Sequence, residues 1–346
     1  MRLGLIARAD SRGLGVQTKA FHDNMAPAKT LVVCTSEAAS AQPLPIRTNW
    51  YPGAQTCPGL PSAGDLDDFL NDIDTVYTAE TGYGHLLWDI AEKRNIRTVL
   101  HANFEFLNTA DRPTQWLAPS LWRITEWPNH TIHLPFPVET DKFPTPHLPE
   151  LPTHLLHIVG RPTQDRNTDL HRNGTIDLLA ALQHVTQPCT VTIRCQHETY
   201  VDHLIAAHSI RIPNNVNLKI MRGDLLNYWD AYQDQHAMIL PRRFGGLCLP
   251  ANEAVAAGIP VVMTDIDPNN TWLPKPWLVP ATPAGSFRAK QIVHCHAADP
   301  AALATKISQL LTDPQWYTDA KKVATHLGRR LSWQSLKPMY EQICIG

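Results

Sequence analysis

The sequence lacks the short motifs that mark several common catalytic and cofactor sites. Its 346 residues contain no CxxC pair, no HExxH motif, no Walker A motif and no GxSxG turn. These absences argue against a zincin metalloprotease, a P-loop nucleotide hydrolase and a nucleophile-elbow hydrolase. The HCH stretch at residues 294–296 is too closely spaced for a standard metal site, so we expect neither a metal nor another cofactor.

Long apolar stretches and a leader segment are also missing. No run of about 18 apolar residues occurs, so we expect no transmembrane helix and no membrane insertion. The N-terminal MRLGLIARADSRG has no apolar segment of signal-peptide length and no small-residue cleavage site, which favours a cytoplasmic location. Seven cysteines at irregular spacing fit reduced, mostly buried thiols.

The chain has little net charge, which argues against a general nucleic-acid-binding surface. Its 30 basic and 32 acidic residues give a formal net charge of −2. The distribution is uneven, because residues 1–150 carry 12 Lys/Arg and 17 Asp/Glu, whereas residues 151–346 carry 18 and 15. We therefore expect an anionic ligand to meet the second half of the chain.

The sequence does contain a repeated alternation of strand-like and helix-like segments. Apolar strands such as RLGLIA and HLLHIVG alternate with helical segments such as YGHLLWDIAEKR and GTIDLLAALQHV. This alternation is typical of an α/β fold, in which helices cover a parallel sheet. A proline-rich run from Pro128 to Pro152 separates two such blocks and is interpreted as a linker. Because 346 residues is long for one core, we expect two Rossmann-like doubly wound domains that face a cleft.

Four strand-to-helix turns are candidate ligand sites, because open α/β sheets bind ligands at the carboxyl ends of their strands. The first turn, residues 8–18, places Gly13 and Gly15 before a helix expected to begin near Val16. Glycine lets a ligand approach the backbone N–H groups, and a helix N-terminus favours an anion. A plain β–α turn is the competing interpretation, since the segment is not a GxGxxG dinucleotide fingerprint.

The second turn, residues 160–175, is rich in arginine. Arg161, Arg166 and Arg172 lie between an expected strand and an expected helix. The planar guanidinium group suits phosphate oxygens, so this turn is a candidate phosphate site. A solvated basic loop is the alternative.

The third turn lies in PRRFGGLCLPANEAVAAGIPVV, residues 241–262. We expect a loop up to Cys248, then a helix with Pro250 in its first turn. The paired glycines free N–H groups for an anion, and a nearby carboxylate can accept hydrogen bonds from a diol such as ribose. The candidate binding residues are Arg242, Arg243, Gly245, Gly246, Leu247 and Glu253. Alternatively, Glu253 interacts only with the helix dipole.

The fourth turn is LHANFEF, residues 100–106. His101 is expected at the end of a strand, and Glu80 ends the strand before it. Both are candidate site residues by this position at the sheet edge. A structural role is the alternative for each, because a lone histidine is usually structural.

Taken in order, these segments resemble the family-4 retaining glycosyltransferases of the GT-B fold. The resemblance covers nearly the whole chain and is carried by RGLGVQT, LHANFE, LPFPVETDKF, IVGR, NGTIDLLAAL and, most specifically, FGGLCLPANEAVAAGIPVV. The segments GLIARAD and PRRFGGLCLP look closest to a subgroup from bacteriophages and their actinobacterial hosts, which implies the host cytoplasm for a phage-encoded protein. The implied domains are an acceptor domain with linker (1–150), a nucleotide-sugar donor domain (151–325) and a C-terminal helix (326–346) that packs back toward the first domain.

The resemblance also implies roles for individual residues. Gly13 and Gly15 would let the first-domain loop approach the donor phosphate and sugar. His101 matches a histidine that contacts the donor sugar near the reacting centre, and Arg161 matches the diphosphate-binding arginine. Glu253 matches the second glutamate of a paired-glutamate motif and would hold the ribose hydroxyls.

The sequence departs from the family pattern in three respects, one of which is a longer than usual spacing from Phe244 to Glu253. The first glutamate of the pair is missing, and Arg242 and Arg243 occupy that region. The family's lysine before glycine is Asn173 here, with Arg172 beside it. The implied catalytic residues are therefore His101, Arg161 and Arg172, with an arginine supplying the charge of the lysine.

The function implied by the resemblance is a retaining, metal-independent hexosyltransferase. A nucleotide-diphosphate sugar, with a UDP-sugar favoured, would donate its sugar to a hydroxyl group of a macromolecule. We expect a phage virion protein or a glycan as the acceptor. A hydroxymethylated DNA base is an alternative acceptor, and it would have to be flipped out of the duplex. Two further functions stay open, namely a sugar-nucleotide epimerase and a non-catalytic nucleotide-sugar binding protein.

Overall fold

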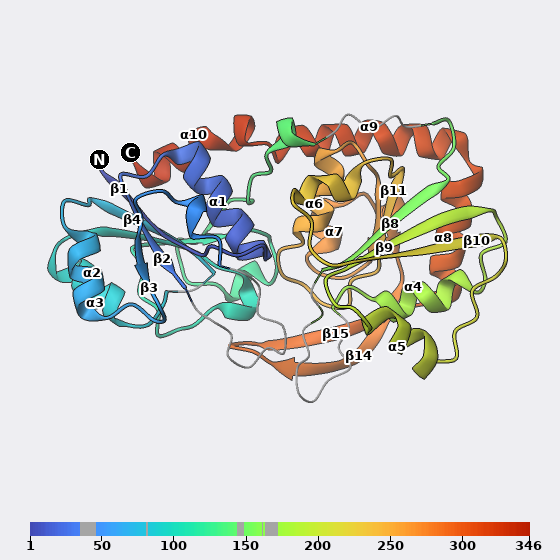
Figure 1. The fold of residues 1–346 in the computed structure, drawn as a ribbon, viewed down its shortest axis with the longest axis horizontal. Coiled ribbons are helices and arrows are strands. Elements are labelled where there is room, and N and C mark those ends of the chain that lie inside the picture. The colour runs from blue at the N-terminus through green and yellow to red at the C-terminus, as the bar shows by residue number, and fades with distance from the viewer. Residues whose placement is uncertain (35–45, 81, 144–148, 161, 163–171) are drawn as a thin grey trace. The chain divides into compact units, whose positions relative to one another are not determined.

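The computed structural model describes residues 1–34, 46–80, 82–143, 149–160, 162 and 172–346. The chain divides into two compact units (Figure 1). Unit 1 comprises Met1–Pro137 and Trp333–Gly346, and unit 2 comprises Val138–Ser332. Part of the proline-rich run expected to be a linker, residues 144–148, lies outside the described residues.

Unit 1 contains a seven-stranded parallel sheet in the order β3-β2-β1-β4-β5-β6-β7. Its strands are β1 (Leu3–Ala7), β2 (Lys29–Val33), β3 (Gln55–Cys57), β4 (Thr75–Ala79), β5 (Arg97–His101), β6 (Gln115–Ala118) and β7 (Ile132–His133). Its α-helices are α1 (Gly13–Met25), α2 (Ala63–Leu70), α3 (Leu86–Lys93) and α10 (Trp333–Cys344). Its short 3-10 helices are η1 (Thr48–Trp50), η2 (Phe104–Phe106) and η3 (Ile124–Glu126). The strand order reverses between β1 and β4, which is the switch point of a doubly wound sheet.

The local sequence explains why these elements form. Every residue of β1 and of β4 is buried, as expected for central strands of a parallel sheet that is covered on both faces. Helix α2 begins with a capping box, in which Ser62 and Asp65 exchange side-chain and backbone hydrogen bonds. Helix α10 packs against α1 (Figure 1). At this contact, the ring of Phe21 meets those of Trp333 and Tyr340 edge to face.

Unit 2 contains a six-stranded parallel sheet in the order β10-β9-β8-β11-β12-β13. Its strands are β8 (His154–Gly160), β9 (Cys189–Cys195), β10 (Val216–Arg222), β11 (Ala237–Leu240), β12 (Val261–Thr264) and β13 (Leu278–Val279). Its α-helices are α4 (Thr175–Leu182), α5 (Tyr200–Ala207), α6 (Leu249–Ala256), α7 (Asn269–Trp272), α8 (Pro300–Thr312) and α9 (Pro314–Arg330). Its 3-10 helices are η4 (Thr140–Lys142), η5 (Tyr228–Tyr232) and η6 (Lys275–Trp277). The order again reverses, here between β8 and β11.

Alternate residues of the unit 2 strands face two separate cores. Leu155 and Ile239 point into the core that α4, α5 and α8 complete. Their neighbours Leu156 and Met238 point into the core that α6 and α9 complete. This two-residue period is the geometry of a strand buried on both faces.

A two-stranded antiparallel hairpin, β14 (Ala281–Arg288) and β15 (Ile292–Ala298), is separate from both parallel sheets (Figure 1). Most residues of β14 are exposed, whereas Val293 and Cys295 of β15 are fully buried. The two parallel sheets with their covering helices confirm the expected α/β class with two doubly wound sheets. No helix in the described ranges is both long and apolar enough to cross a membrane.

Candidate functional site

The candidate site of unit 2 lies at the switch point of its sheet, where β8 and β11 are neighbours. Ligands of doubly wound sheets bind beyond the carboxyl ends of strands at this point. The loop from Pro241 to Cys248, called the β11 loop below, follows β11 and leads into α6. The segment after β8 contains the predicted diphosphate ligand Arg161 and also Arg166, and both lie outside the described residues. The described arginines of this site therefore begin at Arg172.

The start of α4 is pressed against the loop that follows β11. Gly174, the N-cap residue of α4, has a φ of 66°, and a Cβ atom there would lie 1.9 Å from the carbonyl oxygen of Pro241. Only glycine fits this approach and this left-handed backbone. Asn173 donates from Nδ2 to the carbonyls of Ile158 and Val159, at 3.0 and 2.9 Å. The N-terminus of α4 is thus fixed to the end of β8 and to the β11 loop.

A buried histidine underlies this junction. His157 in β8 donates from Nδ1 to the carbonyl of Ile239 at 2.8 Å, because a carbonyl can only accept. Its Nε2 then accepts from the hydroxyl of Thr175, the first residue of α4, at 3.0 Å. Burial lowers the pKa of His157 to about 4, so the ring is neutral at physiological pH. The imidazole joins β8, β11 and α4 without adding charge.

Two predicted arginines converge on one carbonyl of the β11 loop. Arg172 and Arg242 each donate from Nη2 to the carbonyl of Gly245, at 3.2 and 3.4 Å. Arg242 is 3% exposed and also donates from Nε to the carbonyl of Phe244 at 3.1 Å. The guanidinium group of Arg172 lies 5.1 Å from the centre of the Phe244 ring, within cation–π range. The structure therefore brings Arg172, Arg242 and Gly245 together.

Arg243 has different partners. Its Nε lies 3.2 Å from Oδ2 of Asp177 in α4 and donates to the carbonyl of His296 in β15, also at 3.2 Å. Its backbone N–H donates to the carbonyl of Arg172 at 2.8 Å. Burial raises the pKa of Asp177 to about 6, and the positive charge of Arg243 opposes that rise. Arg243 thus connects the loop to α4 and to the hairpin, and Asp177 offsets its charge.

The glycine pair completes the loop. Gly245 and Gly246 are buried, and Gly246 has a φ of 94°, a conformation that L-residues rarely adopt. Leu247 is half-buried between them and Cys248, the N-cap residue of α6. As expected from the sequence, Pro250 lies in the first turn of α6.

Glu253 lies in α6 and is 8% exposed. Its Oε2 accepts a hydrogen bond from the hydroxyl of Tyr232 in η5. Burial raises the pKa of Glu253 to about 7, and the hydrogen bond from Tyr232 opposes that rise. Sequence reasoning missed Tyr232; the available signal was the aromatic pair Tyr228 and Tyr232 in NYWDAYQ, just before a buried strand.

The candidate residues of unit 1 lie near the switch point between β1 and β4. Helix α1 begins at Gly13, three residues before the expected start, and a Cβ atom on Gly15 would lie 1.9 Å from the carbonyl oxygen of Asp10. The carboxylate of Asp10 accepts from the backbone N–H of Arg12 at 3.0 Å and pairs with Arg8 at 2.7 Å. The approach to Asp10 therefore explains why glycine occupies position 15.

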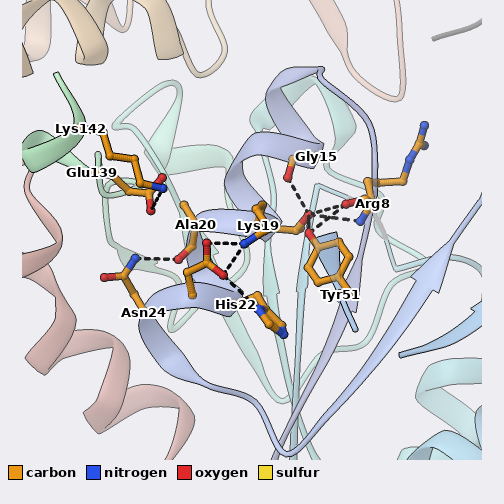
Figure 2. Close-up of polar contacts among 11 residues, drawn as sticks. Arg8, Gly15, Lys19, Ala20, His22, Asn24, Tyr51, Glu139 and Lys142 are labelled. Carbon is orange, nitrogen blue, oxygen red and sulfur yellow. Dashed lines mark hydrogen bonds and ion pairs between the residues drawn. The ribbon is translucent and has the colours of Figure 1, made fainter. Parts of the chain in front are cut away.

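The backbone carbonyl of Arg8, just after β1, is also held by hydrogen bonds. The hydroxyl of Tyr51 donates to the carbonyl of Arg8 at 3.0 Å, and the hydroxyl of Thr18 in α1 donates to the same carbonyl at 3.1 Å (Figure 2). These bonds hold the end of β1 against the first turns of α1, so the turn has a defined shape before any ligand binds.

His101 ends β5 as expected, and its ring is completely buried. Its Nδ1 lies 3.0 Å from the hydroxyl of Tyr77 and 3.3 Å from that of Tyr340, and the ring stacks on Phe136 at 3.8 Å. Burial lowers the pKa of His101 to about 3, so the imidazole is neutral. The His101 ring is therefore held among the side chains of Tyr77, Phe136 and Tyr340.

Glu80 follows β4 in a left-handed conformation with a φ of 61°. Its Oε1 accepts from Nδ2 of Asn103 at 3.1 Å, and its backbone N–H donates to the carbonyl of His101 at 2.8 Å. Such a backbone is uncommon for a residue other than glycine and is concentrated at functional sites. The structure thus places Glu80 beside the end of β5.

Within the ranges that the structure describes, no group of three or more His, Cys, Asp or Glu residues could hold a metal ion. Gly13, Gly15 and His101 belong to unit 1, and Arg172, Arg242, Arg243, the glycine pair, Leu247 and Glu253 belong to unit 2.

Solved structures with similar folds identify the fold of the chain. Sucrose-phosphate synthase from Thermosynechococcus elongatus superposes with a TM-score of 0.68 at 15% identity, covering 99% of this chain and 98% of that chain. A glycosyltransferase from Rickettsia africae gives 0.65 at 14% identity, with 99% and 98% covered. HepE from Anabaena, solved in complex with UDP and glucose, gives 0.68 at 12% identity, again with 99% and 98% covered. The chain therefore has the GT-B fold.

The family comparison is more specific for the second half of the chain. Residues 166–313 match the family described as glycosyl transferases group 1. That segment contains the β11 loop, α6 and the start of α4, which form the candidate site of unit 2. No curated protein sequence matches the chain significantly. The match to the group 1 family and the shared fold support a glycosyltransferase enzyme.

Proposed function

We propose that the protein is a retaining glycosyltransferase that moves a hexose from a nucleotide-diphosphate donor to a hydroxyl group of a macromolecule. The observation that carries the proposal is the β11 loop at the unit 2 switch point, backed by Arg172 and Arg242 and followed by Glu253 in α6. Such a loop offers N–H groups and positive charge to a diphosphate. The carboxyl group of Glu253, close by in the chain, can accept hydrogen bonds from a sugar diol. A UDP-sugar is the favoured donor, since the similar fold of HepE was solved with UDP and glucose.

The reaction requires stabilisation of a leaving group. The bond from the sugar C1 atom to the phosphate oxygen breaks, and the diphosphate gains negative charge. Arginine guanidinium groups fixed near that charge lower the barrier, because they need no reorganisation during the reaction. We assign this role to Arg172 and Arg242, together with Arg161, whose role rests on the sequence alone. We assign Arg243 the role of holding the β11 loop in place, because Asp177 offsets its positive charge.

Bond formation completes the transfer. The acceptor hydroxyl forms a new bond to C1 on the face that the diphosphate leaves, and its proton passes to the departing phosphate oxygen. Configuration at C1 is thereby retained, as in the enzymes that the sequence resembles. In unit 1, Gly13 lies at the start of α1, and the half-buried Glu80 directly follows β4.

The acceptor we favour is a virion protein or a glycan, in the cytoplasm of a host cell if the protein is phage-encoded. The acidic first half of the chain disfavours an extended DNA surface, because a polyanion is repelled by net negative charge.

The test combines a donor panel with an acceptor panel. The full chain is incubated with UDP-, GDP- and TDP-hexoses together with candidate virion proteins, glycans or hydroxymethylated DNA, and products are identified by mass spectrometry. We expect a hexose adduct on a protein or glycan, with an α or β linkage matching that of the donor in proton NMR. An adduct on DNA would replace the proposed acceptor, and conversion of the donor sugar without any acceptor would indicate an epimerase. Tight donor binding with no product in any pair would contradict the transferase function.

Variants separate binding from chemistry. Arg172→Ala and Arg161→Ala should lower the transfer rate by about 100-fold, since each removes a charge from the leaving group. The exposed Arg211 serves as the control, and Arg211→Ala should keep full activity. Equal rates in all three variants would remove the arginines from the mechanism.

A further inference from the structure

Tyr232 is held in one position by unit 2. Its side chain is completely buried, and its ring packs edge to face on Phe143 with centroids 5.3 Å apart. Its hydroxyl lies 3.3 Å from the carbonyl of Pro250 in α6 and donates to Oε2 of Glu253 one turn further along that helix. A buried phenol with two fixed contacts has little freedom to move.

The hydrogen bond from Tyr232 makes the two oxygens of the Glu253 carboxyl group different from each other. In the described part of the chain, Tyr232 is the residue that hydrogen-bonds this group, and it does so at Oε2. Glu253 is 8% exposed, so the carboxyl group retains a path to solvent. Oε1 is thus the oxygen left to accept a hydrogen bond from a ligand.

We propose that Tyr232 is a positioning residue of the nucleotide site: it fixes Oε2 of Glu253, so that Oε1 accepts hydrogen bonds from the ribose hydroxyls of the donor. The inference rests on the proposed function and adds to it a residue that touches no substrate. It also assigns the two carboxyl oxygens separate tasks. Loss of the phenol hydroxyl would free the carboxyl group to rotate and would weaken its bonds to ribose.

Protonation of Glu253 provides an independent readout. Burial raises its pKa to about 7, and the hydrogen bond from Tyr232 lowers it, so removal of the hydroxyl should raise the pKa further. Tyr228 interacts electrostatically with both Glu253 and Glu139. Glu139 in turn forms an ion pair with Lys142 at 2.8 Å (Figure 2). The titratable and charged groups around Glu253 are Tyr228 and Tyr232 from η5, Cys248, and, through Tyr228, Glu139 and Asp141.

The experiment measures how much the ribose hydroxyls contribute to binding. Dissociation constants for UDP and for 2′,3′-dideoxy-UDP are determined by calorimetry at pH 6 and pH 8. The unmodified protein should bind UDP at least about tenfold more tightly than the dideoxy form at pH 8, because hydrogen bonds to a charged group are worth more than neutral ones. This preference should shrink at pH 6, where Glu253 is protonated.

The variants separate positioning from general stability. Glu253→Gln should largely abolish the preference for UDP, and Tyr232→Phe should reduce it several-fold and shift its pH midpoint upward. Tyr317→Phe is the matched control, because Tyr317 is also buried in unit 2 and its hydroxyl donates to the carbonyl of His236 at 2.9 Å. It should leave the preference unchanged.

The outcomes are distinguishable. If UDP binds and Tyr232→Phe keeps both the preference and its pH midpoint, the positioning role is refuted while the proposed function stands. If Tyr232→Phe and Tyr317→Phe reduce the preference equally, a general loss of stability explains the effect and the inference fails. If the unmodified protein binds no UDP, the proposed UDP-sugar donor fails and the inference falls with it.

Discussion

At the scale of single residues, the site depends on close approaches as much as on charge. Gly174 allows α4 to meet the carbonyl of Pro241, and Asn173 and His157 fix the same junction through backbone carbonyls and Thr175. None of these contacts can be read from the sequence, because each partner is distant in the chain. The sequence pattern did indicate Arg172, which ends in contact with Gly245.

Gly174→Ala should be strongly destabilising. The new Cβ atom would collide with the Pro241 carbonyl, and the left-handed backbone adds strain, so we expect a loss of at least about 3 kcal/mol in the free energy of unfolding. Thermal or urea unfolding measures the loss. Gly223 provides the control, because it has a φ of 83° but open space around its Cβ position, and Gly223→Ala should cost only about 1–2 kcal/mol. Equal losses would show that the close approach at Gly174 is not limiting.

At the scale of elements, two residues of the loop after β11, Arg243 and Phe244, connect the β14–β15 hairpin to the site. Arg243 donates to the carbonyl of His296, and the backbone N–H of His296 donates to the carbonyl of Arg243 at 2.7 Å. Phe244 adds an edge-to-face contact with Phe287 at 5.1 Å. The hairpin and the β11 loop therefore share contacts, although His296 lies 53 residues after Arg243 in the chain.

Arg243→Met should loosen this hairpin. The substitution removes the bond to His296 and leaves Asp177 buried without its cation, so hydrogen exchange in residues 292–298 should accelerate by about tenfold or more. Exchange followed by mass spectrometry gives the rate. Arg288→Met, on the exposed end of β14, should leave β15 protected. Unchanged exchange in Arg243→Met would mean that other contacts hold the hairpin.

Element type and order were largely predictable, and contacts were not. The alternation of apolar and amphipathic segments predicted the α/β class, and the glycine, proline and apolar pattern of residues 241–262 predicted the loop, α6 and β12. The β14–β15 hairpin was not anticipated, because ATPAGSFR contains proline and glycine and lacks the alternation that marks a strand. Tyr232 was missed because its role depends on Glu253, which is 21 residues away.

At the scale of the whole molecule, the buried titratable groups give the two units opposite responses to pH. Unit 1 contains the neutral His101, whose lowered pKa contributes stability above pH 6.5 that is lost as the pH falls. Unit 2 contains His157 with the same sign, together with Asp177 and Glu253, whose raised pKa values have the opposite sign. The two acids contribute stability that is present at low pH and is lost as the pH rises toward about 6 and 7.

Acidification from pH 7 to pH 5 should therefore destabilise unit 1 by about 2 kcal/mol and leave unit 2 no less stable. Peroxide oxidation of buried methionines at increasing urea follows the units separately, through Met25 in unit 1 and Met238 in unit 2. The urea midpoint of Met25 should fall at pH 5, and that of Met238 should not. His101→Gln should reduce the shift in unit 1, whereas a parallel fall of both midpoints would contradict the opposite responses of the two units.

The division of the chain between the units has a consequence for its synthesis on the ribosome. Unit 2 is one continuous segment, whereas unit 1 needs Trp333–Gly346 to cover Phe21, Tyr77 and His101. A nascent chain can therefore close the core of unit 2 while unit 1, although translated first, still exposes apolar surface. The first unit to be made is the last to be completed, and chaperones that bind exposed apolar segments should meet it during that interval.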